Sequence, residues 1–197
     1  MPALDKARGA AQRISCVSNL RQIGVGVAMY ASDNNGYSLP GYHVIPPKHR
    51  GPPLWPSPAP TWGLYRLKDY LNPAISYSED DIKLEGVYHC PASEATKDSP
   101  GFSTLNPNRR FPNIYCSYGL NENVSRSMYD GYPPKLYKLT DIVYVADGGW
   151  TWRYPFTAMH GHRIFFHRHS GKTNGLFGGG HVKSLSRDQF DADMCSP

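Results

Sequence analysis

Residues 2–37 read PALDKARGAAQRISCVSNLRQIGVGVAMYASDNNGY, and this stretch predicts the largest element of the fold. Apolar side chains recur here every three or four residues, which is the period of an amphipathic α-helix. The apolar stripe consists of Leu4, Ala7, Ala11, Ile14, Val17, Leu20, Ile23, Val27 and Tyr30. Pro2 suits a first helical turn, and Asp33-Asn34-Asn35-Gly36 is a strong stop signal. The sequence therefore predicts one helix over residues 2–34. Such a long helix needs a long surface to lie against.

The rest of the chain is rich in loops and short strands. Residues 35–113 hold most of the prolines, and a short amphipathic helix is predicted at 62–71. Residues 114–197 alternate apolar runs with turns and predict a small antiparallel sheet. The strands are expected at 87–90, 115–120, 142–146, 163–167, 174–178 and 181–185.

The order of these elements sets the fold class. One long helix comes first, and the strands follow without alternating helices, which is typical of an α+β fold. A length of 197 residues fits a single domain over 1–197. Between the last two strands, Gly179-Gly180 is expected to supply the positive φ angles of a tight hairpin turn.

Composition excludes several classes of protein. An aromatic content of 13% argues against intrinsic disorder. The net charge of +5 is spread along the chain, so we expect a solvated basic surface and no nucleic-acid partner. The longest apolar run, 23–31, is too short to span a membrane, and Met1 to Lys6 do not resemble a signal peptide. Either the protein is cytosolic, or a targeting segment has been removed.

Cysteines and histidines are the candidates for special chemistry. The cysteines are Cys16, Cys90, Cys116 and Cys195, without the paired spacing of a zinc site. They suit one or two disulfides in an oxidising compartment, or are buried thiols of a cytosolic protein, and three pairings are open. Residues two apart on a strand share a face, so His160 with His162, and His167 with His169, could each present two imidazoles to a metal. We expect this metal site less strongly than the disulfides. Asp147 is the one carboxylate close before this histidine cluster.

Sequence signals for catalysis are weak. No G-x-S-x-G nucleophile elbow occurs. The glycines at 178–180 precede a predicted strand and lack the lysine of a phosphate-binding loop. We therefore expect no catalytic residue, no enzymatic activity and no required cofactor.

The two ends of the chain resemble one family. Residues 2–37 are similar to the part of the N-terminal helix that follows the membrane segment in pilin-like proteins. The closing stretch RHSGKTNGLFGGGHV, residues 168–182, resembles the C-terminal H-X9-DG motif of a large bacterial set with prepilin-type signals. The matching motif residues are Arg168, His169, Ser170, Gly171, Asn174, Phe177, Gly179, Gly180 and His181. Shorter anchors match at Tyr88-His89-Cys90-Pro91, at 117–121 and at 145–147.

One position departs from the family pattern. In the family, nine residues separate the motif histidine from an aspartate, and at that position this chain has Gly179. Any role of that carboxylate is therefore absent here, whereas a turn remains possible because Gly-Gly turns about as well as Asp-Gly.

The resemblance implies a fold and a function. It implies a pilin-like fold, with a long N-terminal helix packed on a small antiparallel sheet, in which residues 1–34 are the second half of the pilin helix. It also implies a non-enzymatic subunit of a type II secretion or type IV pilus-like filament. An apolar segment preceding Pro2 would anchor the precursor in the bacterial inner membrane, where a prepilin peptidase would cut and N-methylate it. The soluble part would lie outside the cytoplasm. Its partners would be other subunits, through the helix, and the secretion or pilus machinery.

Two further expectations accompany this interpretation. A Cys16–Cys90 disulfide would tie the helix to the sheet, leaving Cys116 and Cys195 as the second pair. The alternative functions are a surface module that recognises carbohydrate or protein, favoured by Trp55, Trp62, Trp150 and Trp152, and a histidine-rich metal-binding protein.

Overall fold

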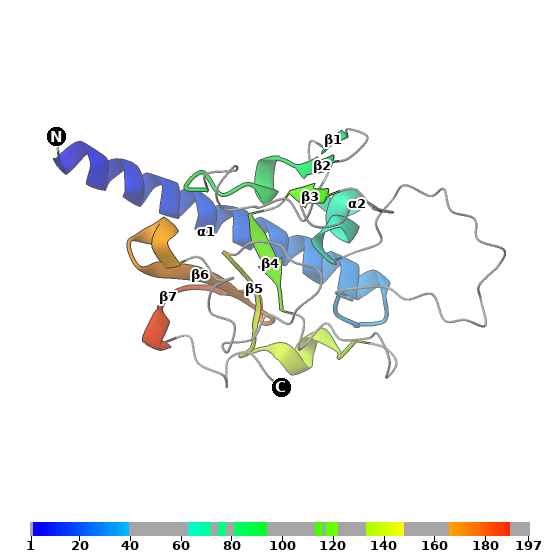
Figure 1. Cartoon of the computed structure of the whole chain (residues 1–197). Coiled ribbons are helices and arrows are strands. Elements are labelled where there is room, and N and C mark those ends of the chain that lie inside the picture. Colours follow the sequence, from blue (N-terminus) through cyan, green and yellow to red (C-terminus); the bar gives the residue numbers. More distant parts are fainter. Residues whose placement is uncertain are drawn as a thin grey trace.

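The computed structural model describes eight segments of the chain (Figure 1), namely residues 2–39, 63–71, 75–77, 81–93, 113–115, 117–121, 133–147 and 166–189. The helical elements are α1 (Pro2–Asp33), η2 (Gly63–Leu67), α2 (Lys68–Leu71), η3 (Gly86–Tyr88), η5 (Leu136–Leu139), η7 (Phe166–His169) and η8 (Arg187–Gln189), where η marks a 3-10 helix. The strands are β1 (Ile75–Tyr77), β2 (Asp81–Leu84), β3 (Asn113–Tyr115), β4 (Tyr118–Leu120), β5 (Val143–Asp147), β6 (Lys172–Phe177) and β7 (Val182–Ser186).

Helix α1 confirms the predicted N-terminal helix and ends where the stop signal predicts. The Asn34 side chain donates to the carbonyl of Tyr30 at 2.8 Å, and the Gly36 amide donates to the carbonyl of Ala31 at 2.6 Å. Asn35 and Gly36 both have positive φ, the left-handed conformation that terminates helices. No helix among the described residues is long and apolar enough to cross a membrane.

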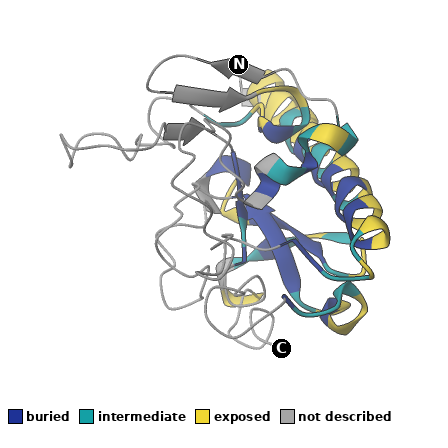
Figure 2. Cartoon of the chain, turned by 90° about the vertical axis from the view of Figure 1, so that its right-hand side faces the viewer, coloured by how far each residue is buried: buried dark blue, intermediate teal, exposed yellow. Residues whose placement is uncertain are grey.

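Only the second half of the apolar stripe is buried (Figure 2). The buried face of α1 consists of Cys16, Leu20, Ile23, Val27, Tyr30 and Ala31. By contrast, Leu4 and Ile14 are 65% and 69% exposed, and every residue from 3 to 11 is exposed. The expectation that the whole stripe lies on the sheet is therefore wrong for its first half. This half of α1 projects beyond the sheets in Figure 1, so none of the described strands lies beneath it.

The predicted antiparallel sheet is present in the order β4-β5-β6-β7. All five residues of β5 are buried, as expected for its β-branched and apolar sequence. Strand β6 is buried from Thr173 to Phe177 and pairs with both β5 and β7. The fold is thus α+β, with an N-terminal helix and a small four-stranded antiparallel sheet.

A second sheet was not predicted. Strands β1, β2 and β3 form a three-stranded sheet in which β1 and β2 are antiparallel, and β2 and β3 parallel. The predicted strand 115–120 is therefore wrong as a single element, since β3 and β4 belong to different sheets. The carbonyl of Tyr88 accepts the amide of Ser117 between them.

Two other predicted strands are wrong where the structure describes them. Residues 86–88 form η3, which begins at Gly86 with a φ of 64°. The Tyr88 ring is buried, and its hydroxyl donates to the carbonyl of Leu64 at 3.2 Å. Residues 166–169 form η7 and not the end of a strand. Short apolar runs fit either conformation, and tertiary contacts decide between them.

The β6–β7 hairpin is confirmed, but its turn differs from the prediction. Only Gly180 has positive φ, at 86°, whereas the expected primed turn needs it at both central residues. The Gly180 amide donates to the carbonyl of Phe177, and the Phe177 amide donates to the carbonyl of His181. Position 178 has no room for a side chain, because a Cβ there would lie 2.3 Å from the Leu139 carbonyl oxygen.

Candidate functional site

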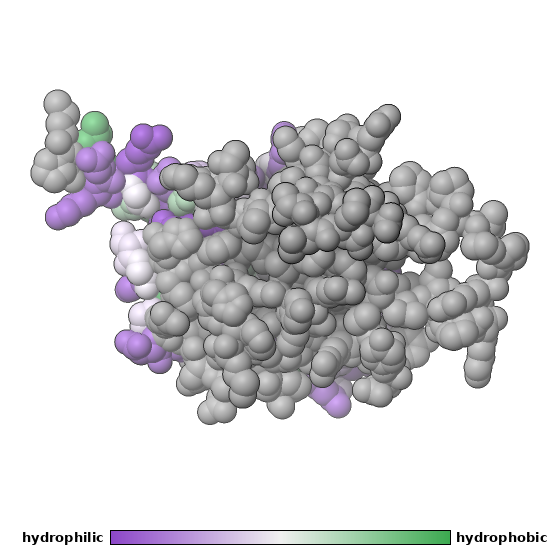
Figure 3. All heavy atoms as spheres, in the orientation of Figure 1, coloured by the Kyte–Doolittle hydropathy of each residue, from purple (hydrophilic) through white to green (hydrophobic). Residues whose placement is uncertain are grey.

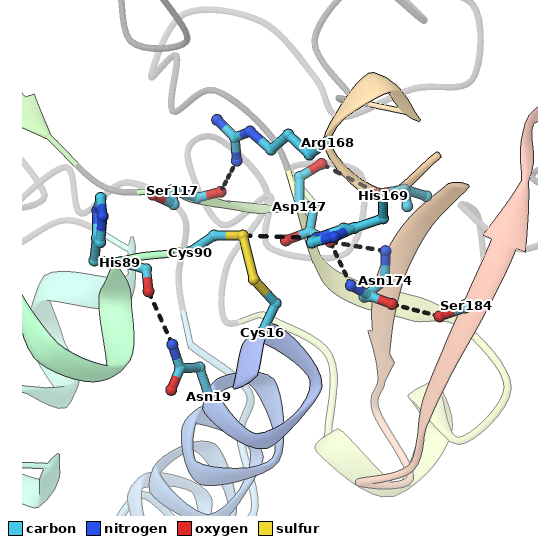
Figure 4. Close-up of polar contacts among 11 residues, drawn as sticks. Cys16, Asn19, His89, Cys90, Ser117, Asp147, Arg168, His169, Asn174 and Ser184 are labelled. Carbon is cyan, nitrogen blue, oxygen red and sulfur yellow. Dashed lines mark hydrogen bonds and ion pairs between the residues drawn. A yellow bond between two sulfur atoms is a disulfide. The ribbon is translucent and has the colours of Figure 1, made fainter. Parts of the chain in front are cut away.

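A buried polar cluster lies where α1, η3, β5, β6 and η7 meet (Figure 4). It consists of the Cys16–Cys90 disulfide and the side chains of Asp147, His169 and Asn174. Each of these residues is at most 3% exposed. Buried polar groups are costly unless they are hydrogen-bonded, so the contacts inside this cluster determine what it can do.

The disulfide joins α1 to the segment after η3. This pairing of Cys16 with Cys90 confirms the first of the two expected disulfides, and the Cα atoms lie 5.2 Å apart. Two side chains of the helix add hydrogen bonds beside it. Asn19 donates to the carbonyl of His89 at 2.8 Å, and Gln12 donates to the carbonyl of Pro91 at 3.1 Å. The second expected pair, Cys116 and Cys195, lies outside the described residues.

Asp147 is the acceptor at the centre of the cluster. It ends β5, and because Ala146 pairs with Gly175, Asp147 lies beside Asn174 on β6. Its Oδ2 accepts the backbone amide of Asn174 at 2.9 Å and the Asn174 side-chain amide at 2.8 Å. Asn174 is itself oriented by its cross-strand partner Ser184, whose hydroxyl donates to Asn174 Oδ1.

His169 bridges Asp147 and the disulfide. Its Nε2 lies 3.1 Å from Asp147 Oδ2 and 3.6 Å from Cys90 Sγ. Within the part of the chain that the structure describes, neither His169 Nδ1 nor Asp147 Oδ1 has a hydrogen-bond partner. Ser170 and Gly171, with φ angles of 56° and 84°, turn the chain from η7 into β6. This turn lets His169 and Asn174 approach the same carboxylate.

Arg168, the first residue of the motif, points to another strand. Its side chain is buried, and Nη1 donates to the carbonyl of Ser117 at 2.8 Å. Ser117 immediately precedes β4. Residues 168–171 therefore link η7 to the start of β4 and to β5 by side-chain contacts, and lead the chain into β6.

The remaining motif residues lie at the other end of β6. Phe177 and His181 stack across the hairpin with ring centroids 4.4 Å apart. Gly179, where the family has aspartate, is exposed at the turn and donates its amide to the carbonyl of Thr140 at 3.2 Å. The motif thus forms two separate structures, one around Asp147 and one at the hairpin turn.

His167 and His169 do not share a strand face, so the expected histidine cluster on strands is wrong for this pair. Both residues belong to η7. His169 binds Asp147 and is near Cys90. His160 and His162 lie outside the described residues. The four tryptophans that favoured a recognition surface lie outside them as well.

The sequence identifies the members of the cluster as candidate residues, but it does not predict that they lie together. Asp147 is the carboxylate nearest in sequence to the histidines His160 to His169, and Asn174 belongs to the C-terminal motif. The register of β5 against β6 brings Asp147 beside Asn174. The residues of either strand alone do not specify that register.

No protein-family model, no curated protein and no solved structure matches this chain.

Proposed function

We propose that this chain is a non-enzymatic structural subunit of a filament related to type II secretion pseudopilins and type IV pilins. The observation that carries this proposal is the division of α1 into a packed half and a projecting half. Residues from Cys16 to Ala31 supply the buried face of the helix, whereas residues 3–11 are all exposed. A helix that extends beyond its own domain is suited to contact a neighbour.

Residues 3–11 of α1 are exposed, so this half gains little stability from packing against the rest of the described chain. An isolated helix of about 12–15 residues is marginal in water, because helical stability comes mostly from packing. Figure 3 shows this end as largely hydrophilic, with a hydrophobic spot near the tip. Leu4 and Ile14 are the large apolar side chains exposed there. Together with Asp5, Lys6, Arg8 and Arg13, they provide both apolar and charged contacts for a second subunit.

The two sequence motifs support the same proposal. The N-terminal motif supplies the helix, and the C-terminal motif supplies contacts that hold the sheet together, through Arg168, His169 and Asn174. These contacts are buried, so a structural role explains them without a substrate. The Cys16–Cys90 disulfide suits an oxidising compartment outside the cytoplasm.

By the resemblance, an apolar segment upstream of Pro2 anchors the precursor in the inner membrane. Prepilin peptidase removes its leader, and the helix then enters a filament with other subunits. The described part of the chain remains outside the cytoplasmic membrane, where secretion or pilus machinery acts on it.

The mature N-terminus tests this proposal. The protein is isolated from the cell envelope of its source bacterium, and its N-terminal peptide is sequenced by mass spectrometry. We expect an N-methylated residue that begins an apolar segment continuous with Pro2. An unmethylated chain that starts at Met1 or Pro2, recovered only from the soluble fraction, contradicts the proposal.

A further inference from the structure

The buried cluster contains the four side chains of a possible metal site. Cys16, Cys90, Asp147 and His169 each offer one ligand atom, and these atoms all lie within 4.8 Å of one another. They come from α1, from the segment after η3, from β5 and from η7, so the fold itself brings them together. Two thiolates, one imidazole and one carboxylate form a donor set that suits Zn²⁺. We propose that the dithiol form of this chain binds one Zn²⁺ between these four residues.

The distances around His169 fit a tetrahedral zinc site. With Zn–S bonds of about 2.3 Å and Zn–N or Zn–O bonds of about 2.0 Å, tetrahedral geometry separates sulfur from nitrogen by about 3.5 Å and nitrogen from oxygen by about 3.3 Å. Cys90 Sγ lies 3.6 Å from His169 Nε2, and Asp147 Oδ2 lies 3.1 Å from the same nitrogen. Both distances from His169 Nε2 are therefore already close to those that the ion requires. Cleavage of the disulfide lets Cys16 Sγ move away from Cys90 Sγ to complete the tetrahedron.

Hydrogen bonds around the site orient its carboxylate. Asn174 holds Asp147 through two donors, and Ser184 holds Asn174. Metal-binding carboxylates and histidines are commonly oriented by such an outer shell of hydrogen bonds. Asp147 Oδ1 and His169 Nδ1 lack partners among the described residues, although both are buried. The ligand atoms of the site are the other oxygen and the other nitrogen, Asp147 Oδ2 and His169 Nε2, so Oδ1 and Nδ1 stay available for outer-shell hydrogen bonds.

The disulfide and the zinc site are mutually exclusive states of the same two cysteines. A dithiol reductant breaks the S–S bond, passes two electrons and two protons to the sulfurs, and itself becomes a disulfide. Zn²⁺ then replaces the two thiol protons, which are released to solvent. The dithiol precedes the disulfide in the life of the chain, so zinc would occupy the protein before its oxidation. This inference does not depend on assembly into a filament.

Metal binding by the reduced protein tests the proposal. The other two cysteines are removed with Cys116→Ser and Cys195→Ser, and the disulfide is reduced with a phosphine. Zn²⁺ is titrated against a chromophoric chelator, and Co²⁺ is added separately as a spectroscopic probe. We expect one ion per chain, and for Co²⁺ a thiolate charge-transfer band with the intense visible absorption of four-coordinate cobalt. The oxidised form of the same protein should bind no metal at this site.

Single substitutions assign the ligands. His169→Gln and Asp147→Asn keep both thiols and should each weaken Zn²⁺ binding by at least about 10-fold, since loss of even an outer-shell contact has that effect. His89→Ala is the matched control, because His89 is exposed and next to Cys90, and it should leave the affinity unchanged.

Two results overturn the proposal. One is a reduced protein that binds no Zn²⁺ in competition with the chelator. If reduction unfolds the chain, Zn²⁺ must restore its circular dichroism spectrum, and failure to do so counts as the same result. The other is unchanged binding in His169→Gln or in a Cys16→Ser variant, which would place the ion elsewhere.

Discussion

His169 Nε2 lies 3.1 Å from Asp147 Oδ2, so the histidine of the C-terminal motif is tied to the last residue of β5. Asn174, from the same motif, donates twice to the same oxygen. One carboxylate thus accepts hydrogen bonds from both η7 and β6. The C-terminal motif acts as an internal connection of the sheet.

Removal of this carboxylate should be costly. Asp147→Ala leaves the donors of Asn174 and His169 buried without their acceptor, and each unsatisfied group costs about 1–3 kcal/mol. We expect the free energy of unfolding in urea to fall by about 3 kcal/mol or more. Asp141→Ala, at an exposed residue just before β5, is the control and should change it by less than about 0.5 kcal/mol. Equal effects of the two substitutions would contradict the role given to Asp147.

The Cys16–Cys90 disulfide should stabilise the fold strongly. It links residues 74 positions apart, and the loss of chain entropy in the unfolded state corresponds to about 4 kcal/mol. Urea unfolding with and without reductant, in the presence of a metal chelator, measures this contribution. The Cys116→Ser, Cys195→Ser variant is the background that isolates the bond. Coincident unfolding curves would show that the link adds nothing.

Gly178 should be intolerant of a side chain. A Cβ at this position would lie 2.3 Å from the carbonyl oxygen and 2.6 Å from the Cβ of Leu139, and the backbone would have to move. Overpacking of this kind costs about 1–3 kcal/mol, so Gly178→Ala should lower the free energy of unfolding by that amount. Gly9→Ala, on the exposed part of α1 with nothing within 4 Å of the added Cβ, should not lower it. Thermal unfolding of the two variants distinguishes these outcomes.

A side chain at Gly179, where the family that this chain resembles has aspartate, has a smaller steric consequence. An added Cβ there would lie 3.0 Å from the carbonyl oxygen and from Cγ2 of Thr140, both in the turn before β5. A shift of a few tenths of an ångström would accommodate it. The family's aspartate therefore fits this turn only with a slightly different position of Thr140.

Tyr144 should make stability depend on alkaline pH. Its hydroxyl is buried and donates to the carbonyl of Leu39 at 3.2 Å, and burial raises the pKa of the phenol above its ordinary value. The folded state keeps this proton while the unfolded chain releases it above about pH 10. The contribution of Tyr144 is thus complete below that pH and falls by about 1.4 kcal/mol per pH unit above it.

Tyr144→Phe isolates this effect. The variant should lose about 1 kcal/mol near neutral pH, because Leu39 loses a buried donor. Above about pH 10 the difference from the unsubstituted protein should shrink, as the phenylalanine cannot titrate. Urea midpoints measured between about pH 9 and about pH 11 provide the comparison. A difference that stays constant or grows over this range would contradict the assignment.

The predictable parts of this fold are those encoded locally. The helix, its stop at Asn34-Asn35-Gly36, the buried strand at 143–147 and the hairpin around Gly180 each follow from residues close in the chain. The Cys16–Cys90 pairing was also anticipated.

What the sequence could not specify depends on distant contacts. Strands β1 to β3 have no strong apolar alternation, and β3 pairs with β2 across a long gap in sequence. Residues 86–88 have strand-like composition, yet Gly86 and the contact of Tyr88 with Leu64 favour a turn. The contact between His169 and Asp147 depends on the register of β5 against β6, which the residues of either strand alone do not specify.

The exposed first half of α1 is central to the proposed function, and a photo-crosslink tests it most directly. A photoreactive amino acid replaces Ile14 in the full-length protein, expressed in its source bacterium and irradiated in intact cells. Tyr137, which is 72% exposed on η5, is the control position outside the helix. We expect a ladder of products containing several copies of this protein or related subunits from position 14, and none from position 137. Monomer alone at position 14, or the same ladder from both positions, would contradict it.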